Sequence, residues 1–314
     1  MVIVFSLISC ALFSKASAFE IHATLSGGYE SNPALDPNDE ESSSLAIYAL
    51  EMDKVFSLPS SFEGDLVFAG LYKDYFKCGD TFQGSASFGL RRSFFLQRLI
   101  PSLIFTSEIC RDKIRRENEK DSFAVDFGAH YIPSPQLMVG VFSAWTWEND
   151  ADLSDDSQAS FVGRQFQGGH SSTGTGTDSY SSYSSADDYI HTLSFSLNFQ
   201  PTRFFYIDFM YKNNRFSSQE YTSDEFIVSP TFIAPKDITI SMTASLVEYL
   251  YHKALESNYL RPEQERFLSM TMEKSFGWIT PYILISWVEG DLVSSVAQKY
   301  YHNEVGECGI SVLF

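Results

Sequence analysis

The sequence predicts an all-β protein, an antiparallel up-and-down transmembrane β-barrel of about 14 strands. Three observations carry this prediction. Polar and apolar residues alternate with a period of two along most of the chain. The polar connections between these segments alternate between long and short. The alternation also continues to the last residue, Phe314, whereas a soluble domain usually leaves its final residues frayed.

Composition limits the classes of function. The chain has 314 residues, a formal net charge of −18 and a sequence pI of about 4.6. Such acidity argues against nucleic-acid binding, which needs clustered Lys and Arg to neutralise phosphates. The one basic segment, 113–120, is diluted by Glu117 and Glu119. No apolar run approaches the roughly 20 residues that a transmembrane helix needs.

The first residues are typical of a secretory signal peptide, with an apolar core over 2–13 and a small-residue cleavage pattern at 16–18. We expect residues 1–18 to be the signal peptide and residues 19–314 to form the barrel. No Lys or Arg precedes the core, which departs from the usual pattern. A lipoprotein cleavage box at Cys10 is the alternative, and either leader directs export.

Fourteen segments show the strand pattern, and most are close to the roughly 9–11 residues of a tilted transmembrane strand. The expected strands cover residues 20–30, 43–55, 64–76, 81–92, 98–111, 121–132, 136–148, 188–200, 203–213, 223–233, 237–250, 265–275, 279–290 and 303–314. Pro101, Pro230 and Pro281 fall inside these spans, and proline cannot donate a ladder hydrogen bond. We therefore expect a strand end or a bulge at each proline.

The connections predict how the barrel is oriented. The odd-numbered ones are mostly long and polar, and the even-numbered ones are short turns such as 133–135 and 200–202. Long outer loops and short periplasmic turns are the pattern of outer-membrane barrels. Because hydrocarbon offers the backbone no hydrogen-bond partners, a spanning sheet has to close on itself. The last strand is therefore expected to pair with the first, near residues 21–29.

The C-terminal pattern resembles the assembly signal of bacterial outer-membrane barrels, with Ile310, Val312 and Phe314 as its members. Cys308 and Gly306 match that signal less well. The resemblance implies a location in the bacterial outer membrane. It also implies contact with the barrel assembly machinery, with outer-membrane lipid and with lipopolysaccharide.

The segment "GGYESNPAL" at 27–35 is similar to the end of the first strand in bacterial β-barrel porins. It also resembles the barrel domain of surface lipoprotein assembly modifiers, which likewise have fourteen strands. The chain has no helical-repeat domain before its barrel, and this difference argues against a role in lipoprotein export. In physical terms, the Asn32-Pro33 pair is a turn initiator that ends the strand.

If the aromatic faces meet lipid, the opposite faces line a lumen rich in Ser and Thr. The charged residues expected on this lining are Arg91, Asp126, Glu148, Asp208, Lys212, Glu273 and Glu307. Fourteen strands lie between the eight that fill their own interior and the sixteen to eighteen of wide pores. We expect a porin-like channel for passive diffusion of small polar solutes, with a weak preference for cations. The alternative is a plugged, non-conducting barrel that acts through its outer loops in secretion or adhesion.

The long connection 149–188 is rich in Gly, Ser and Thr and allows two roles, a constriction folded into the pore or a surface coat. Acidic residues gather in two outer loops, at 36–41 and 148–156. Their spacing lacks the glycine and glutamate of a calcium loop, so ordinary solvated loops are the preferred interpretation over loose divalent-ion binding. We expect no cofactor and no metal site.

The cysteines and histidines suggest no enzyme. Cys78 and Cys110 fall near the same predicted rim and are a possible disulfide in an oxidising compartment, while Cys308 is expected to face lipid. No Cys/His spacing indicates zinc. His191 and Ser194 are close in sequence, but on a strand they point to opposite faces, so we expect no nucleophilic catalysis.

Overall fold

The computed structural model describes residues 19–33, 42–114, 119–150, 188–216, 221–251, 261–293 and 298–314. Within these residues the chain forms fourteen strands and one short 3-10 helix, η1 (Pro59–Ser61). The strands are β1 (Glu20–Glu30), β2 (Ser43–Leu58), β3 (Phe62–Tyr75), β4 (Gly79–Arg92), β5 (Leu99–Asp112), β6 (Lys120–Ser134), β7 (Leu137–Asp150), β8 (Asp188–Thr202), β9 (Phe205–Phe216), β10 (Tyr221–Ala234), β11 (Ile238–Tyr251), β12 (Arg261–Lys274), β13 (Ile279–Val293) and β14 (Gln298–Leu313). Among the described residues, no helix is long and apolar enough to cross a membrane.

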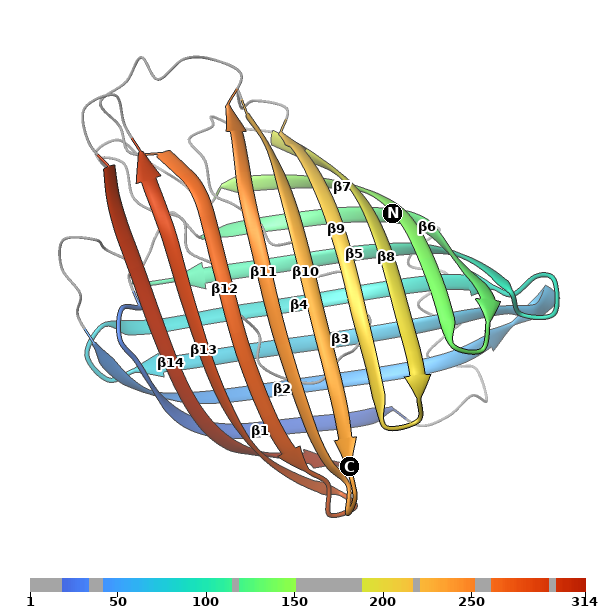
Figure 1. The fold of residues 1–314 in the computed structure, drawn as a ribbon, viewed down its shortest axis with the longest axis horizontal. Helices are drawn as coiled ribbons and strands as arrows, with labels where there is room; N and C mark the ends of the chain where they lie inside the picture. Colours follow the sequence, from blue (N-terminus) through green and yellow to red (C-terminus); the bar gives the residue numbers. More distant parts are fainter. Residues whose placement is uncertain are drawn as a thin grey trace.

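Each strand pairs antiparallel with its neighbours in the chain, and β14 pairs with β1, so the sheet is a closed barrel. Figure 1 shows the strands following one another around the wall, with β1 and β14 side by side. The seam runs from the pair His22 and Leu313 to the pair Glu30 and Val305. The Phe314 N–H also donates to the Ile21 carbonyl at 2.9 Å. The predicted fold class and its closure are confirmed.

The connections mostly follow the expected alternation. Those that join β2 to β3, β4 to β5, and so on to β12 and β13 span two to six residues, and we call their end of the barrel the turn end; β1 starts there and β14 ends there. The opposite end, where the odd-numbered connections lie, is called the loop end. The odd-numbered connections are expected to be mostly long, and three of them are short: 76–78 between β3 and β4, 217–220 between β9 and β10, and 294–297 between β13 and β14.

Most strand boundaries lie close to the expected ones, and β1 covers the residues predicted for it. The largest differences are at the starts of β14 and β12, which begin at Gln298 and Arg261 rather than at 303 and 265. In both cases the structure extends the ladder into polar sequence at the loop end. Backbone pairing carries on there although the period-two apolar signal has stopped.

The three prolines do not all end strands or form bulges, and Pro230 lies in the middle of β10. Each pairs with a neighbouring strand on one side only. The partners are Ala129 for Pro101, Ile207 for Pro230 and Ile310 for Pro281. On the other side, none of the three prolines has a paired residue in the described ladder. Since proline has no N–H to donate, a one-sided ladder is the arrangement it permits.

Alternation along the strands gives the wall two chemically different faces. The outer face carries large exposed apolar side chains on every strand, such as Leu25, Tyr48, Phe127 and Ile285. The opposite, inner face carries buried polar side chains such as Ser26. An exposed apolar exterior around a closed sheet is what a hydrocarbon environment requires.

Aromatic rings cover glycines on both faces of the wall. On the inner face Tyr301 pairs with Gly290, and a Cβ at Gly290 would lie 2.1 Å from the Tyr301 ring. On the outer face the Phe56 ring covers Gly64 in the same way, at 2.3 Å. Here glycine provides room for close approach of a ring, and its conformational freedom is not needed.

Candidate functional site: the inner wall

The register decides which charged side chains share the inner wall. All seven residues expected on the lumen lining lie on the same face as Ser26 and its buried polar equivalents on the other strands. They are Arg91 on β4, Asp126 on β6, Glu148 on β7, Asp208 and Lys212 on β9, Glu273 on β12 and Glu307 on β14. They are spread around the circumference and do not form one cluster.

The inner wall is strongly acidic. The acidic residues that the register places on it are Glu20, Glu30, Glu51, Asp53, Glu63, Asp65, Glu108, Asp112, Asp126, Glu148, Asp208, Glu225, Glu265, Glu273 and Glu307. The basic residues of the same face, among those described, are Lys73, Arg91, Lys120, Lys212 and Lys299. The excess of carboxylates gives the enclosed space a negative potential.

Two ion pairs bridge neighbouring strands near the loop end. Lys120 Nζ lies 3.2 Å from Glu148 Oε1, joining β6 to β7. Lys212 Nζ lies 3.5 Å from Glu225 Oε2, joining β9 to β10. The side chains of both pairs are largely buried, and Glu225 is 1% exposed. Burial removes the carboxylates from water, so each needs its cation nearby.

At the loop end of the seam, the motif "GYESN" binds the last strand. Asn303 Nδ2 donates to Glu30 Oε1 and Tyr75 donates its hydroxyl to Glu30 Oε2, both at 2.7 Å. The Asn32 N–H donates to Asn303 Oδ1 at 2.9 Å, and the Ser31 N–H donates to the Glu304 carbonyl at 2.9 Å. The residues that carry the family resemblance therefore join β1 to β14.

Further along the seam, Glu307 is the inner-wall residue that links three strands. It accepts hydrogen bonds from Ser26 on β1, at 2.7 Å, and from the Tyr282 hydroxyl on β13. Other expected lumen residues also have defined partners. Arg91 Nε donates to Glu63 at 2.8 Å, and Asn198 donates to Asp208. The seven expected lining residues are thus held by neighbouring strands where contacts are described.

The two ends of the inner wall differ in exposure. Toward the loop end, apolar side chains form buried clusters on the inner face, one of Leu45, Ile47 and Tyr75 and another of Phe267, Val288, Leu292 and Tyr301. Toward the turn end, Glu20 and Val55 are exposed, and His22 is partly exposed. The inner wall is therefore more open to water at its turn end.

The outer face holds a serine–histidine pair that the sequence did not indicate. Ser143 Oγ lies 2.8 Å from His191 Nε2, and the Trp145 ring lies 5.0 Å from the His191 ring. Their partnership joins β7 to β8, so it is invisible in local sequence. No other described side chain hydrogen-bonds the His191 ring, and a catalytic pair needs a group to orient its base.

No disulfide joins Cys78 to Cys110 within the described residues. Cys110 is buried on β5, and Cys78 packs against the inner cluster around Tyr75. Their pairing in an oxidising compartment stays a prediction. Cys308 is exposed on β14 and shares the outer face with Ile310 and the other members of the C-terminal pattern.

Several sequence predictions lie outside the described residues. They concern the signal peptide at 1–18, the interior of the 149–188 connection, and the acidic loop residues Asp36, Asp39, Glu40, Glu41, Asp152, Asp155 and Asp156. The sequence pattern did not point to Lys120, Glu225 or the partners of Glu30. Lys120 continues the alternation of its strand by one residue, so the period could have found it. Glu225 lies among apolar residues of both parities and gave no such signal.

No protein-family model matches the chain, and no curated protein matches it. Solved structures do. An anion-selective porin from Comamonas acidovorans is similar at a TM-score of 0.52 with 6% identity, covering 96% of this chain and 100% of that one. The chain has the closed β-barrel fold of outer-membrane proteins. A bacterial polysaccharide outer membrane secretin is similar at a TM-score of 0.51 with 10% identity, and the coverage is again 96% and 100%. At these identities the likeness establishes architecture, which leaves function to be argued from the site.

Proposed function

We propose that the chain is a porin-like channel of the bacterial outer membrane through which small polar solutes diffuse passively. The observation that carries the proposal is the contrast between the two faces of a closed wall. The outer face is apolar and exposed, and the inner face is polar and charged. A lipid-facing exterior around a hydrophilic interior is the arrangement of a diffusion pore.

The location follows from the same contrast. Closed barrels avoid unpaired backbone groups in hydrocarbon, and barrels of this kind with short turns at one end are typical of the outer membrane. The proposal includes removal of residues 1–18 during export, so that the barrel begins at Phe19. It also includes recognition of Ile310, Val312 and Phe314 by the barrel assembly machinery, and contact of the loop end with lipopolysaccharide.

The charge of the inner wall gives the channel a direction of selectivity. Carboxylates outnumber basic groups there, and those near the turn end are exposed, as Glu20 and Glu63 are, or partly exposed. A cleft lined by one sign of charge concentrates counter-ions. The channel therefore favours cations over anions. This preference differs from the one that the name of the Comamonas porin states for that protein.

The role is non-enzymatic in this proposal. The Ser143–His191 pair faces outward, and the described residues supply no orienting third group. Its structural use is to satisfy two polar groups on the apolar face. Ser143→Ala is expected to leave single-channel conductance unchanged.

Conductance tests the proposal. Purified protein in a planar bilayer is expected to give discrete current steps. Under a tenfold KCl gradient the reversal potential should shift toward the K⁺ value, whose limit is about 59 mV. The double variant Glu51→Gln/Asp53→Asn should move it toward zero, because both carboxylates lie on the inner wall. Asp74→Asn removes a carboxylate from the outer face of β3 and serves as the control.

Two results would contradict the proposal. A folded barrel, verified by a difference in gel mobility between unheated and heated samples, that gives no current steps would indicate the non-conducting surface barrel instead. Current steps with a reversal potential on the Cl⁻ side would retain the pore and refute its cation preference.

A further inference from the structure

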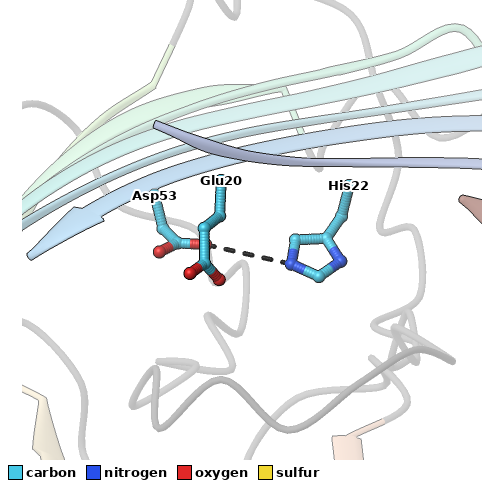
Figure 2. Close-up of side chains that lie close together, drawn as sticks. All are labelled: Glu20, His22 and Asp53. Atoms are coloured by element: carbon cyan, nitrogen blue, oxygen red, sulfur yellow. Dashed lines mark ion pairs between the residues drawn. The ribbon is translucent and has the colours of Figure 1, made fainter. Parts of the chain in front are cut away.

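Three metal-ligating side chains meet on the inner wall at the turn end of the seam. Glu20 and His22 are alternate residues of β1, and Asp53 on β2 pairs with Glu20 across the ladder. His22 Nε2 lies 4.0 Å from Asp53 Oδ2. One ligand atom from each of the three side chains lies within 4.8 Å of the others. Figure 2 shows all three side chains on the same side of the two strands, with the carboxylates beside the imidazole.

We propose that Glu20, His22 and Asp53 form a binding site for a divalent transition-metal ion, with Zn²⁺ as the reference ion. One imidazole nitrogen and two carboxylate oxygens are a donor set that zinc accepts, at metal–ligand distances of about 2.0–2.2 Å. Tetrahedral donors at those distances are about 3.3–3.6 Å apart. The described separations are slightly larger, and these partly exposed side chains can close the difference by small rotations.

The electrostatics of the cluster favour a cation. No described Lys or Arg forms an ion pair with Glu20 or Asp53, whose one described ionic contact is that between Asp53 and His22. Lys54 follows Asp53 in the chain but points to the other face, over the Phe19 ring. Among the described residues, the two carboxylates thus lie close together without a Lys or Arg partner. A divalent ion would neutralise them, and the imidazole makes the set more suitable for zinc than for the all-oxygen sites of calcium.

The next residue on the ladder extends the donor set. Glu51 pairs with His22, just as Asp53 pairs with Glu20, so the four residues form a square on the inner wall. Glu51 lies outside the 4.8 Å group. Its place at the corner makes it available to complete four-coordination or to orient a bound water.

The position of the site gives the metal a structural role. A bound ion would tie β1 to β2 at the turn end, next to the seam, because its ligand His22 also pairs with Leu313 on β14. Metal binding to the native arrangement also stabilises it, since binding energy adds to folding energy. The site shares Asp53 with the inner-wall carboxylates that favour cations, but a bound metal ion is not required for solute diffusion. Binding is measured on the folded protein in detergent, so its failure leaves the proposed channel intact and the converse also holds.

The experiment is a Zn²⁺ titration of the folded barrel against a chromophoric chelator, repeated with Co²⁺ for its visible spectrum. We expect one equivalent of tightly bound metal. The Co²⁺ spectrum should show tetrahedral d–d bands without sulfur-to-metal charge transfer, which separates this site from the thiols of Cys78, Cys110 and Cys308. His22→Ala and Asp53→Asn should each weaken binding by at least about tenfold, as the loss of even an outer partner does.

Glu273→Gln is the matched control, because it removes an inner-wall carboxylate on β12 without touching the cluster. It should bind metal as the parent does. The proposal is overturned by either of two results. One is unchanged affinity in His22→Ala, and the other is an equal loss in Glu273→Gln, which would indicate general charge attraction. If a variant folds poorly, protection of the parent's His22 from diethyl pyrocarbonate by Zn²⁺ decides the question, and absence of protection refutes the site.

Discussion

Asn303 on the last strand donates a 2.7 Å hydrogen bond to Glu30 on the first strand, across the seam that closes the barrel. Both residues are buried. Asn303→Ala is expected to lower the free energy of unfolding by about 1–3 kcal/mol, because Glu30 loses one of its two described donors in a buried place. Denaturant unfolding in micelles, followed by tryptophan fluorescence, measures the change. Ser57→Ala, at an exposed position on β2, should have no effect. Equal stability of Asn303→Ala and its parent would mean that this bond does not secure the seam.

Gly290 is expected to tolerate no side chain. A Cβ there would meet the Tyr301 ring, which donates its hydroxyl to Glu265 at 3.0 Å. Gly290→Ala should destabilise the barrel by about 1–3 kcal/mol through overpacking. Gly306→Ala is the matched control on the neighbouring strand, since no described atom lies within 4 Å of the place its methyl group would take. Similar midpoints for the two variants would show that the Tyr301 ring moves aside at no cost.

Lys212 is expected to matter through the carboxylate beside it. Lys212→Met removes the cation from Glu225, which is 1% exposed, and breaking one partner of a buried pair costs about 3–5 kcal/mol. The double variant Lys212→Met/Glu225→Leu should recover most of that loss, because it leaves no buried charge. Thermal unfolding of the four proteins in a double-mutant cycle measures the coupling. A double variant as unstable as the single one would refute the ion-pair explanation.

Lys113 lies in the connection after β5, and its ion pair with Asp80 leads to a prediction about pH. Its Nζ is 2.7 Å from Asp80 Oδ1, and the hydrogen bond to Asp80 raises the pKa of Lys113 above its ordinary value. A raised pKa means that the contribution to stability is present below the ordinary lysine value and is lost as pH rises through the folded one. Asp80→Asn should return the pKa of Lys113 toward ordinary, as read from its ¹³Cε shift. Because Lys113 is exposed to solvent and Asp80 is partly exposed, stability near neutral pH should hardly change. An unchanged pKa would contradict the pairing.

The sequence was sufficient for the fold because lipid imposes a strict period. Alternate residues of a strand point to opposite faces, so assigning one residue to a face assigns every other residue of its strand. Leu25 and Tyr48 face outward in accordance with this rule. That rule also placed Asp126 and Glu307 on the inner face before any pairing was known. The rule worked least well where strands extend beyond their alternating apolar residues, as at the start of β14.

The local contacts of the candidate site needed the register, which the sequence did not supply. Asp53 is beside Glu20 only because β2 pairs with β1 at one particular offset. Ser143 on β7 contacts His191 on β8, and a long connection separates these two neighbouring strands in the sequence. A period-two pattern states which face a residue occupies. It does not state which residue of the next strand lies opposite, so pairs and clusters are available only from the ladder itself.

The order of strands around the wall has a consequence for how the chain folds. Every ladder except one joins strands that are consecutive in the chain, so hairpins can form in succession from local encounters. The remaining ladder joins residues as far apart as His22 and Leu313, which are 291 positions apart in the chain (313 − 22). Bringing such distant segments together carries the largest loop entropy and slows folding. The pairing of β1 with β14 is thus expected to be the rate-limiting step of folding, after the other ladders of the sheet have formed.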